Sequence, residues 1–194
     1  MVDLSVAKVP YTLCATNKII AEKSIPVHRL YTTNKNSKSS IKYRIREIEE
    51  NDLKRGGVLE VLENLAPVGE LDRTTAHNIY QQIKSNPLHK VFVAVQGDRN
   101  DDDDNQGLII GTTTLLVEPK FIFGGTRFGH VEDVAVRKEY EGIGIGSKLV
   151  RHATESAAKM GCMKTVLYCS DDRMSFYKRL GYSYRDNCME IQHT

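Results

Sequence analysis

The sequence predicts a single α+β (mixed α/β) domain in which helices pack against one central mixed sheet. Three observations support this prediction. The chain has 194 residues, 40% of them hydrophobic, which is enough for one domain with its own core. Segments with strand and helix patterns follow one another in the order β-α-α-β-β-β-α-β-α-β. A glycine-rich turn at residues 142–146 joins a valine-rich strand to a helix, about two-thirds of the way along the chain.

We expect the folded domain at residues 41–194, after an N-terminal extension at residues 1–40. The extension ends in TTNKNSKSS, a polar segment typical of a flexible tail or linker. It lacks the charged start, apolar block and small-residue cleavage site of a secretory signal peptide, so we expect a cytoplasmic protein with four reduced cysteines. No run of about 18 apolar residues predicts a membrane span. A net charge of +2 without a basic face argues against nucleic acid as a partner.

The first half of the domain is predicted to begin with a strand and two helices. Residues 41–48 alternate apolar and basic side chains, as a half-exposed strand does. Residues 49–65 have helical spacing, although the glycine pair at 56–57 weakens the first turn. Asp72 is a candidate N-cap for a second helix that ends before Pro87. The apolar face of the first helix is predicted to contain Val58, Leu62 and Leu65.

A hairpin follows, with an acidic loop between its strands. KVFVAV, residues 90–95, is a short buried strand, and LIIGTTTLLVE, residues 108–118, is the second. The loop contains Asp101–Asp104, which could bind a divalent cation but lacks the central glycine and terminal glutamate of an EF-hand. We therefore interpret the aspartates as a solvated loop and expect no metal.

The second half of the domain contains the glycine-rich turn and the elements around it. Residues 130–136 form a strand, residues 146–160 a helix, residues 163–169 a strand and residues 171–181 a short helix. The tail, residues 182–194, could supply a last strand. The apolar face of the longer helix is predicted to contain Leu149, Val150, Ala153, Ala157 and Met160.

The glycine-rich turn admits several interpretations. A dinucleotide fold requires G-x-G-x-x-G near the first strand, with an acidic residue about 20 positions later. A P-loop requires G-x-x-x-x-G-K-[ST], whereas here the order is GSK. Two interpretations remain. Either main-chain amides and a helix N-terminus form another kind of pyrophosphate site, or the turn binds nothing.

The segments GHVEDVAVRKEYEGIGIGSKLV and GCMKTVLYCSDDRMSFYKRLGY resemble the GNAT superfamily of N-acetyltransferases. Its hallmark is Gln/Arg-x-x-Gly-x-Gly/Ala after a strand; here Glu141 departs from the pattern, while Gly144 and Gly146 match it. YRIREIEENDL, VLENLAPVG, EPKFIF and GHVEDVAV follow the order and spacing of the glucosamine-6-phosphate N-acetyltransferase family. The resemblance covers roughly residues 42–192. It implies the GNAT acyl-CoA N-acyltransferase fold, with a mostly antiparallel sheet flanked by helices.

The resemblance implies acetyl-CoA as co-substrate and direct transfer of its acetyl group to a sugar amine. Main-chain groups of Val134, Ala135 and Val136 would pair with the pantetheine arm. Arg173 stands where the family usually has an asparagine that contacts the cofactor, and Tyr177 would donate a proton to the departing thiolate. The pyrophosphate would be bound by the loop residues Gly142, Ile143, Gly144, Ile145, Gly146 and Ser147.

The acceptor amine is expected beside an acidic pair. Glu132 and Asp133 occupy the family's paired acidic positions, and because adjacent strand residues point to opposite faces, they are not expected to share a proton. Glu132 would orient sugar hydroxyls or the ammonium group. Tyr168 replaces the family's acidic residue at the amine, so only its main-chain carbonyl could accept from the amine. His130 is a candidate general base, but we interpret it as a structural histidine at the end of the strand.

The sugar phosphate is expected beside two lysines. Lys120 and Lys164 match family positions that line the substrate site, and cations suit a dianionic phosphate. The other substrate-binding residues implied by the resemblance are Phe121, Ile122, Phe123, Val134 and Met163.

Several positions depart from the family pattern, and they leave alternatives open. Phe123 replaces a common histidine, Ala66 and Pro67 replace a threonine segment, and Gln192 replaces an arginine near the phosphate. A related amino-sugar phosphate, a polyamine or a protein amine remain alternative acceptors, and a non-catalytic acyl-CoA sensor is a further alternative. The resemblance also implies a homodimer that exchanges its last strands and completes its active site at the interface. The product would feed UDP-N-acetylglucosamine synthesis.

Overall fold

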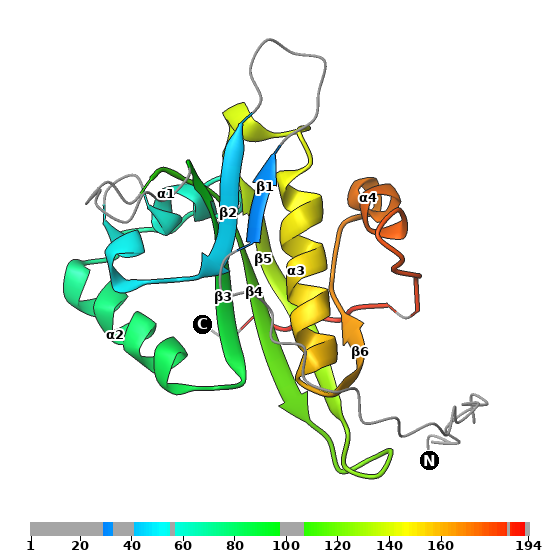
Figure 1. Cartoon of the computed structure of the whole chain (residues 1–194). Coiled ribbons are helices and arrows are strands. Elements are labelled where there is room, and N and C mark those ends of the chain that lie inside the picture. Colours follow the sequence, from blue (N-terminus) through cyan, green and yellow to red (C-terminus); the bar gives the residue numbers. More distant parts are fainter. Residues whose placement is uncertain (1–28, 33–40, 55–56, 98–106, 186, 193–194) are drawn as a thin grey trace.

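The computed structural model describes residues 29–32, 41–54, 57–97, 107–185 and 187–192 (Figure 1). Its described strands form one six-stranded sheet whose spatial order follows the chain. Neighbouring strands pair antiparallel except the last two, which pair parallel. A mixed, mostly antiparallel sheet is therefore confirmed. The strands are β1 (Arg29–Thr32), β2 (Lys42–Glu47), β3 (His89–Gln96), β4 (Ile109–Pro119), β5 (Arg127–Val136) and β6 (Cys162–Val166).

Helices cover both faces of this sheet. The long helix α3 lies against one face, and α1 and α2 lie against the other (Figure 1). The short helix α4 lies beyond β6. The α-helices are α1 (Val58–Leu62), α2 (Arg73–Ser85), α3 (Ile145–Lys159) and α4 (Met174–Lys178), and the 3-10 turns are η1 (Glu50–Leu53), η2 (Lys138–Tyr140) and η3 (Asp171–Arg173).

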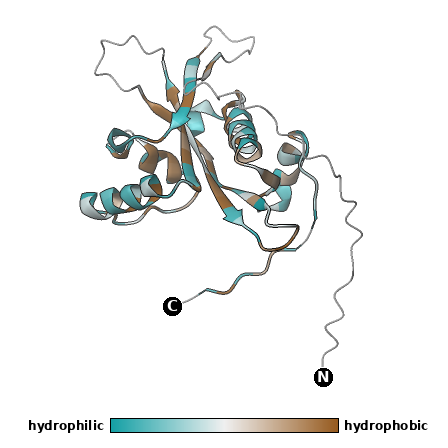
Figure 2. Ribbon diagram, turned by 60° about the horizontal axis from the view of Figure 1, so that its bottom comes forward, coloured by the Kyte–Doolittle hydropathy of each residue, from teal (hydrophilic) through white to brown (hydrophobic). Residues whose placement is uncertain are grey.

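Two hydrophobic cores result, one on each face of the sheet. The core under α3 includes Ile110 and Leu115 from β4 and Leu149 and Ala153 from the helix. The core under α1 and α2 includes Val93 from β3. The central strands β3 and β4 are buried on both faces, so their sequences are apolar runs rather than alternating patterns. Figure 2 shows these apolar strands between helices whose outer sides are hydrophilic.

The helical segment predicted at residues 49–65 contains two separate elements, η1 and α1, and Gly57 directly precedes α1. A Cβ atom on Gly57 would lie 1.9 Å from the main-chain oxygen of Asp52, so only glycine fits there. A buried ion pair holds η1 against β2, with Arg46 donating to both Asp52 carboxylate oxygens at 2.6 and 2.8 Å. The prediction for Leu65 is wrong: α1 ends before it, and its side chain is 52% exposed.

Local signals located both ends of α2 and the end of α3, whereas the helix predicted at residues 171–181 consists of η3 and α4 and ends at Lys178. Asp72 caps α2 by accepting from the main-chain N–H of Thr75 at 2.8 Å, and the helix ends at Ser85. Gly161 follows α3 with φ +78°, as a helix-terminating glycine does. The predicted apolar face of α3 packs into the core, although Met160 is only partly buried.

The two ends of the domain differ from the predictions. The strand β1 pairs with β2, and Tyr31 stacks on Tyr43 with ring centroids 5.4 Å apart. Paired structure therefore begins before the predicted boundary at residue 41. At the other end, the described residues of the tail form no strand, and Met189 is 95% exposed. The prediction of a last strand is not met within one chain, because no described strand edge pairs with this segment.

The sheet opens where β5 and β6 part. Their parallel register ends at the pair His130 and Val166, while β5 continues to Val136. The segment after Val166, predicted as strand up to residue 169, has no strand pairing. Beyond His130, β5 therefore has a paired edge toward β4 and no paired strand of the described chain on its other edge.

Candidate active site

The unpaired edge of β5 presents main-chain groups into the opening. Arg137 donates its main-chain N–H to the oxygen of Ile110 at 3.0 Å, within the pairing of β5 with β4. Alternate residues of an antiparallel strand direct their N–H and C=O groups to opposite sides. The groups of Val136, and by the same alternation those of Val134, therefore face the opening. Ala135 faces β4, so of the three predicted residues only two can offer main-chain bonds there.

The side chains of this segment are occupied by packing. Val134 and Val136 contact the core under α3, and Ala135 is 5% exposed within the core under α1. The segment can therefore bind a ligand only through its main chain. An extended amide-containing arm could pair with Val134 and Val136 as an additional strand does.

A bulge at Asp133 interrupts the strand next to this segment. Thr112 pairs with Ala135, but Thr114 pairs with Glu132, so β5 has one extra residue here. Asp133 has φ +51°, a conformation that aspartate tolerates better than most residues. Its carboxylate accepts from the Thr114 hydroxyl at 3.1 Å. The expectation of simple alternation across the acidic pair is therefore wrong, because Thr114 lies beside both residues.

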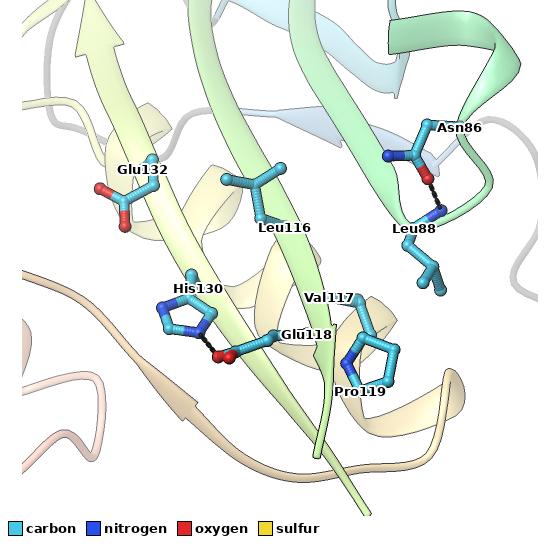
Figure 3. A pocket seen from close by; sticks show the side chains of 8 residues that line it. All are labelled: Asn86, Leu88, Leu116, Val117, Glu118, Pro119, His130 and Glu132. Atoms are coloured by element: carbon cyan, nitrogen blue, oxygen red, sulfur yellow. Dashed lines mark hydrogen bonds and ion pairs between the residues drawn. The ribbon is translucent and has the colours of Figure 1, made fainter. Parts of the chain in front are cut away.

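Glu132 lies at one end of a shallow groove of about 500 Å³ on the α1 and α2 side of the sheet (Figure 3). Burial raises the pKa of its carboxyl, the nearby Asp133 carboxylate raises it further, and His130 opposes the shift. Protonation of Glu132 is therefore easier than that of an exposed glutamate. The groove is lined by Asn86, Leu88, Leu116, Val117, Glu118, Pro119, His130 and Glu132.

The glycine-rich turn forms the N-terminus of α3. Gly142 and Gly144 have φ values of +72° and +93°, which only glycine adopts readily. Gly144 caps the helix without a side-chain hydrogen bond, and the first turn contains no acidic residue. The amides of the first turn, including Gly146 and Ser147, therefore have no intrahelical acceptor and suit an anion. A Cβ atom on Gly144 would contact nothing within 4 Å, so the turn is not filled by side chains.

Hydrophobic side chains of this turn pack into the core under α3. Ile145 is 1% exposed, and Ile143 packs against the same core. Glu141, the departure from the family pattern, is exposed, and its main-chain N–H donates to the oxygen of Lys138 at 3.3 Å. The acidic side chain is therefore not among the buried groups of the turn.

Tyr177, on α4, lies beside the turn. Its neighbour Phe176 places a ring atom 3.7 Å from the position of a Cβ on Gly146. Tyr177 itself contacts the rings of Phe176 and Tyr182, with centroids 4.9 and 6.1 Å away. Burial raises the pKa of the Tyr177 hydroxyl, and Cys169, Tyr182 and Glu132 raise it further. The hydroxyl therefore stays protonated at neutral pH and can donate a proton.

The loop between β6 and α4 contains the remaining predicted residues on this side. Tyr168 is 64% exposed. Arg173 is exposed and forms an ion pair with Asp172 at 3.2 Å. It lies close enough to Tyr177 to oppose the rise in that hydroxyl's pKa. Cys169 in the same loop has a free thiol.

The two predicted lysines meet at one aromatic ring. The ammonium nitrogens of Lys164 and Lys120 lie 4.3 and 5.2 Å from the ring centroid of Phe128. Lys120 also forms an ion pair with Glu118, whose other oxygen lies 3.1 Å from Nε2 of His130. The two hydrogen bonds, first from Lys120 and then from His130, lower the pKa of Glu118. Sequence reasoning missed Glu118 and Phe128, because only strand register reveals these neighbours.

Other predicted substrate residues lie outside the groove. Phe121, Ile122 and Phe123 form the tip between β4 and β5, where Phe121 is fully exposed and Phe123 has φ +53°. Met163, on β6, is 51% exposed. Gln192 donates to Glu190 in the tail at 3.2 Å. Ala66 and Pro67 follow α1, outside the groove lining.

The described residues lack two features that are typical of other protein classes. Among the described residues, His, Cys, Asp and Glu side chains form no group of three or more suited to a metal ion, and Asp101–Asp104 lies outside those residues. Within the same part of the chain, no helix has the length and hydropathy to span a membrane.

Comparisons with known proteins agree with this geometry. A model of the acetyltransferase (GNAT) family matches residues 58–182. A glucosamine 6-phosphate N-acetyltransferase from Trypanosoma brucei brucei is 31% identical over 148 residues, covering 76% of this chain and 93% of the relative. Glucosamine 6-phosphate N-acetyltransferase 1 from Oryza sativa subsp. japonica is 33% identical, and the match covers 72% of this chain and 81% of the relative. The crystal structure of glucosamine-6-phosphate N-acetyltransferase from Arabidopsis thaliana superposes with a TM-score of 0.70 at 28% identity. The superposition covers 78% of this chain and 99% of that chain.

Proposed function

The chain belongs to the acetyltransferase (GNAT) family, and from that premise we propose that it transfers the acetyl group of acetyl-CoA to the amine of glucosamine 6-phosphate. The relatives that support this acceptor are named for the same reaction and are 31% and 33% identical to this chain. The product is N-acetylglucosamine 6-phosphate, a precursor for UDP-N-acetylglucosamine.

One structural observation carries the proposal. The unpaired main-chain edge of β5, the open amides at the start of α3 and the helix of Tyr177 lie close together, because a Cβ on Gly146 would lie 3.5 Å from Val136 and 3.7 Å from Phe176. An extended arm that ends in a diphosphate at one side and a thioester at the other requires these three elements. The residues therefore fit acetyl-CoA.

The chain's own groups can hold the donor and accept its charge. Acetyl-CoA supplies an activated thioester, which the amine attacks directly, without a covalent enzyme intermediate. The main chain of Val134 and Val136 would hold the pantetheine arm, and the amides from Gly142 to Ser147 would hold the pyrophosphate. Tyr177 would donate its proton to the departing thiolate, because its raised pKa keeps the hydroxyl protonated until then.

The groove of Figure 3 would hold the acceptor. Glu132, with its raised pKa, would bind the sugar hydroxyls or the amine at one end. Phe128 and the lysines around it lie four residues earlier on β5, about 13 Å away along the strand. A sugar with its amine at Glu132 would direct its phosphate along β5 toward Lys120 and Lys164, whose ammonium groups lie against the Phe128 ring.

We also propose that the enzyme is a homodimer with the active site at the subunit interface. The tail carries apolar side chains that this chain does not bury, with Met189 95% and Ile191 78% exposed. The tip formed by Phe121, Ile122 and Phe123 is exposed as well. A second copy could bury these groups and pair with the tail, which would bring the tail's residues to the partner's groove.

The reaction is tested by following release of free CoA thiol with one acceptor at a time. We expect release with glucosamine 6-phosphate at a far higher kcat/KM than with glucosamine, polyamines or peptide amines. Release mainly with a polyamine or peptide would assign the enzyme a different acceptor. Tight CoA binding without release from any amine would identify a sensor instead.

A further inference from the structure

The ring of Phe128 lies at the centre of a charged cluster on the acceptor side of the sheet. Phe128 is 8% exposed, yet two ammonium groups lie against its ring, that of Lys164 at 4.3 Å and that of Lys120 at 5.2 Å from the centroid. Phe123 stacks against the same ring, with centroids 6.1 Å apart. The aromatic ring is therefore a group that both lysines contact.

Strand register explains why the lysines meet there. Phe128 pairs with Glu118 on β4 and with Lys164 on β6. Lys120 follows Glu118 by two residues, and its main-chain N–H donates to the oxygen of Thr126 at 2.8 Å, which turns the chain back toward β5. A lysine that directly follows β4 and a lysine of β6 thus both contact the ring of Phe128 on β5, the strand between them.

The charges of the cluster do not balance. Glu118 is ion-paired with Lys120 and also bonded to His130. Within the described chain, no carboxylate lies within ion-pair distance of Lys164. The cluster therefore contains two ammonium groups and one carboxylate, which is paired with Lys120 and not with Lys164, so it has surplus positive charge. A phosphate dianion is the ligand that such a cluster favours.

We propose that Phe128 is a positioning residue for the phosphate of the acceptor, acting through Lys120 and Lys164. A carboxylate in its place would also hold the lysines, but it would neutralise them. An aromatic face attracts an ammonium group while leaving its charge available to a ligand. Phe128 thus holds the two ammonium groups together next to Glu118 and His130, which line the groove. This inference rests on the proposed function, since it assumes a phosphorylated acceptor in that groove.

Steady-state kinetics test the proposal through the phosphate. In Phe128→Leu we expect KM for glucosamine 6-phosphate to rise about fivefold to thirtyfold, the loss of two cation–π contacts. The kcat and the KM for acetyl-CoA should stay near their wild-type values, and kcat/KM for unphosphorylated glucosamine should not change. Phe128→Tyr keeps the aromatic face and should restore the KM. An unchanged KM, or an equal loss with both sugars, would overturn the proposal.

A binding measurement separates this inference from the proposed reaction. Glucose 6-phosphate has no amine, so calorimetry reports its binding whether or not the protein transfers acetyl groups. We expect Phe128→Leu to weaken glucose 6-phosphate binding by a similar factor. If the protein acetylates no sugar but the variant still binds glucose 6-phosphate more weakly, the positioning role is supported and the proposed reaction is rejected. No binding to wild type would overturn the positioning role itself.

A second pair of variants covers failure of Phe128→Leu to fold. Lys164→Met removes the ammonium group that lies closest to the ring, and Lys159→Met removes an exposed lysine from the last turn of α3. Only Lys164→Met should weaken glucose 6-phosphate binding. Equal affinities in the two variants would contradict the proposal.

Discussion

At the scale of single residues, burial shifts the pKa values of two groups near the opening. The same physical cause, loss of water around the charged form, raises the pKa of both Tyr177 and Glu132. For the tyrosine this favours a neutral proton donor at physiological pH. For the glutamate it makes the ionised form costly, and this cost is compensated only when a cationic or hydrogen-bonding ligand arrives.

Tyr177→Phe should lower kcat about a hundredfold or more, because it removes a proton donor and leaves the packing of the ring intact. The KM for acetyl-CoA should change little. Tyr182→Phe is the matched control. It removes the 2.7 Å hydrogen bond between Tyr182 and Thr154, which should cost about 1 kcal/mol of stability. Its kcat should stay unchanged. Stopped-flow thiol detection and thermal melts measure both effects. Equal turnover of Tyr177→Phe and wild type would remove the tyrosine from the mechanism.

Glu132→Gln should stabilise the fold at pH 7. The folded-state pKa of Glu132 lies above its unfolded value, so its contribution to stability falls as pH rises through the window between them. The advantage of Gln should shrink as pH falls toward 4.5, the ordinary value for glutamate. Glu118 provides the opposite sign, because its pKa is lowered by Lys120 and His130. Glu118→Gln should therefore lose stability at pH 7 and recover in acid.

Urea titrations at several pH values measure both variants against the wild type. A Glu132→Gln protein less stable than wild type at pH 7, with its packing intact, would contradict the raised pKa.

At the scale of elements, glycines at the two ends of α3 allow the cost of a left-handed backbone conformation to be distinguished from an effect on ligand binding. Gly144 and Gly161 both have positive φ, and a Cβ on either would contact nothing within 4 Å. An alanine at either position should therefore cost about 1 kcal/mol of stability through the left-handed conformation alone. Only Gly144 lies at the N-terminus, where the open amides are.

Gly144→Ala should weaken acetyl-CoA binding about tenfold or more, whereas Gly161→Ala should bind normally. The added methyl group and the altered turn should remove hydrogen bonds from main-chain amides to the charged pyrophosphate. Each such hydrogen bond contributes about 1.5–3 kcal/mol to binding. Calorimetric titration with acetyl-CoA measures the difference. Similar affinities in the two variants would show that the cofactor does not bind at this helix end.

At the scale of the whole molecule, the tail is one of the parts whose apolar side chains a single chain leaves exposed. The double variant Met189→Asp, Ile191→Asp should shift the proposed dimer to monomer and lower activity, because charges in an apolar interface are costly. Ile79→Asp, at an exposed position on the outer side of α2, is the control and should remain dimeric. Sedimentation velocity measures the mass. A wild-type protein that sediments as a fully active monomer would contradict the dimer proposal.

Helix ends and turns were predictable because their signals are local. Asp72 caps α2 through its own neighbour three residues later, and Gly161 ends α3 by its own backbone angle. The glycine-rich turn was recognisable for the same reason. The limits of local signals are visible at Leu65, whose helical spacing continues past the end of α1.

Strand contacts were not predictable, because they depend on register between distant segments. The bulge at Asp133 cancels the alternation that the sequence predicts, and the convergence of Lys120 and Lys164 on Phe128 combines three strands. The pairing of β1 with β2 likewise requires a partner far along the chain.

The sequence by itself determined the family, the ends of α2 and the position of the glycine-rich turn for which we propose pyrophosphate binding, since each depends on residues within a few positions of one another. The tertiary structure decided which main-chain edge is open, which side of the sheet contains the acidic groove, and which aromatic ring the lysines share. The physical reason is that side-chain direction in a strand has a period of two, so one extra residue or a change of partner reverses which face a group occupies.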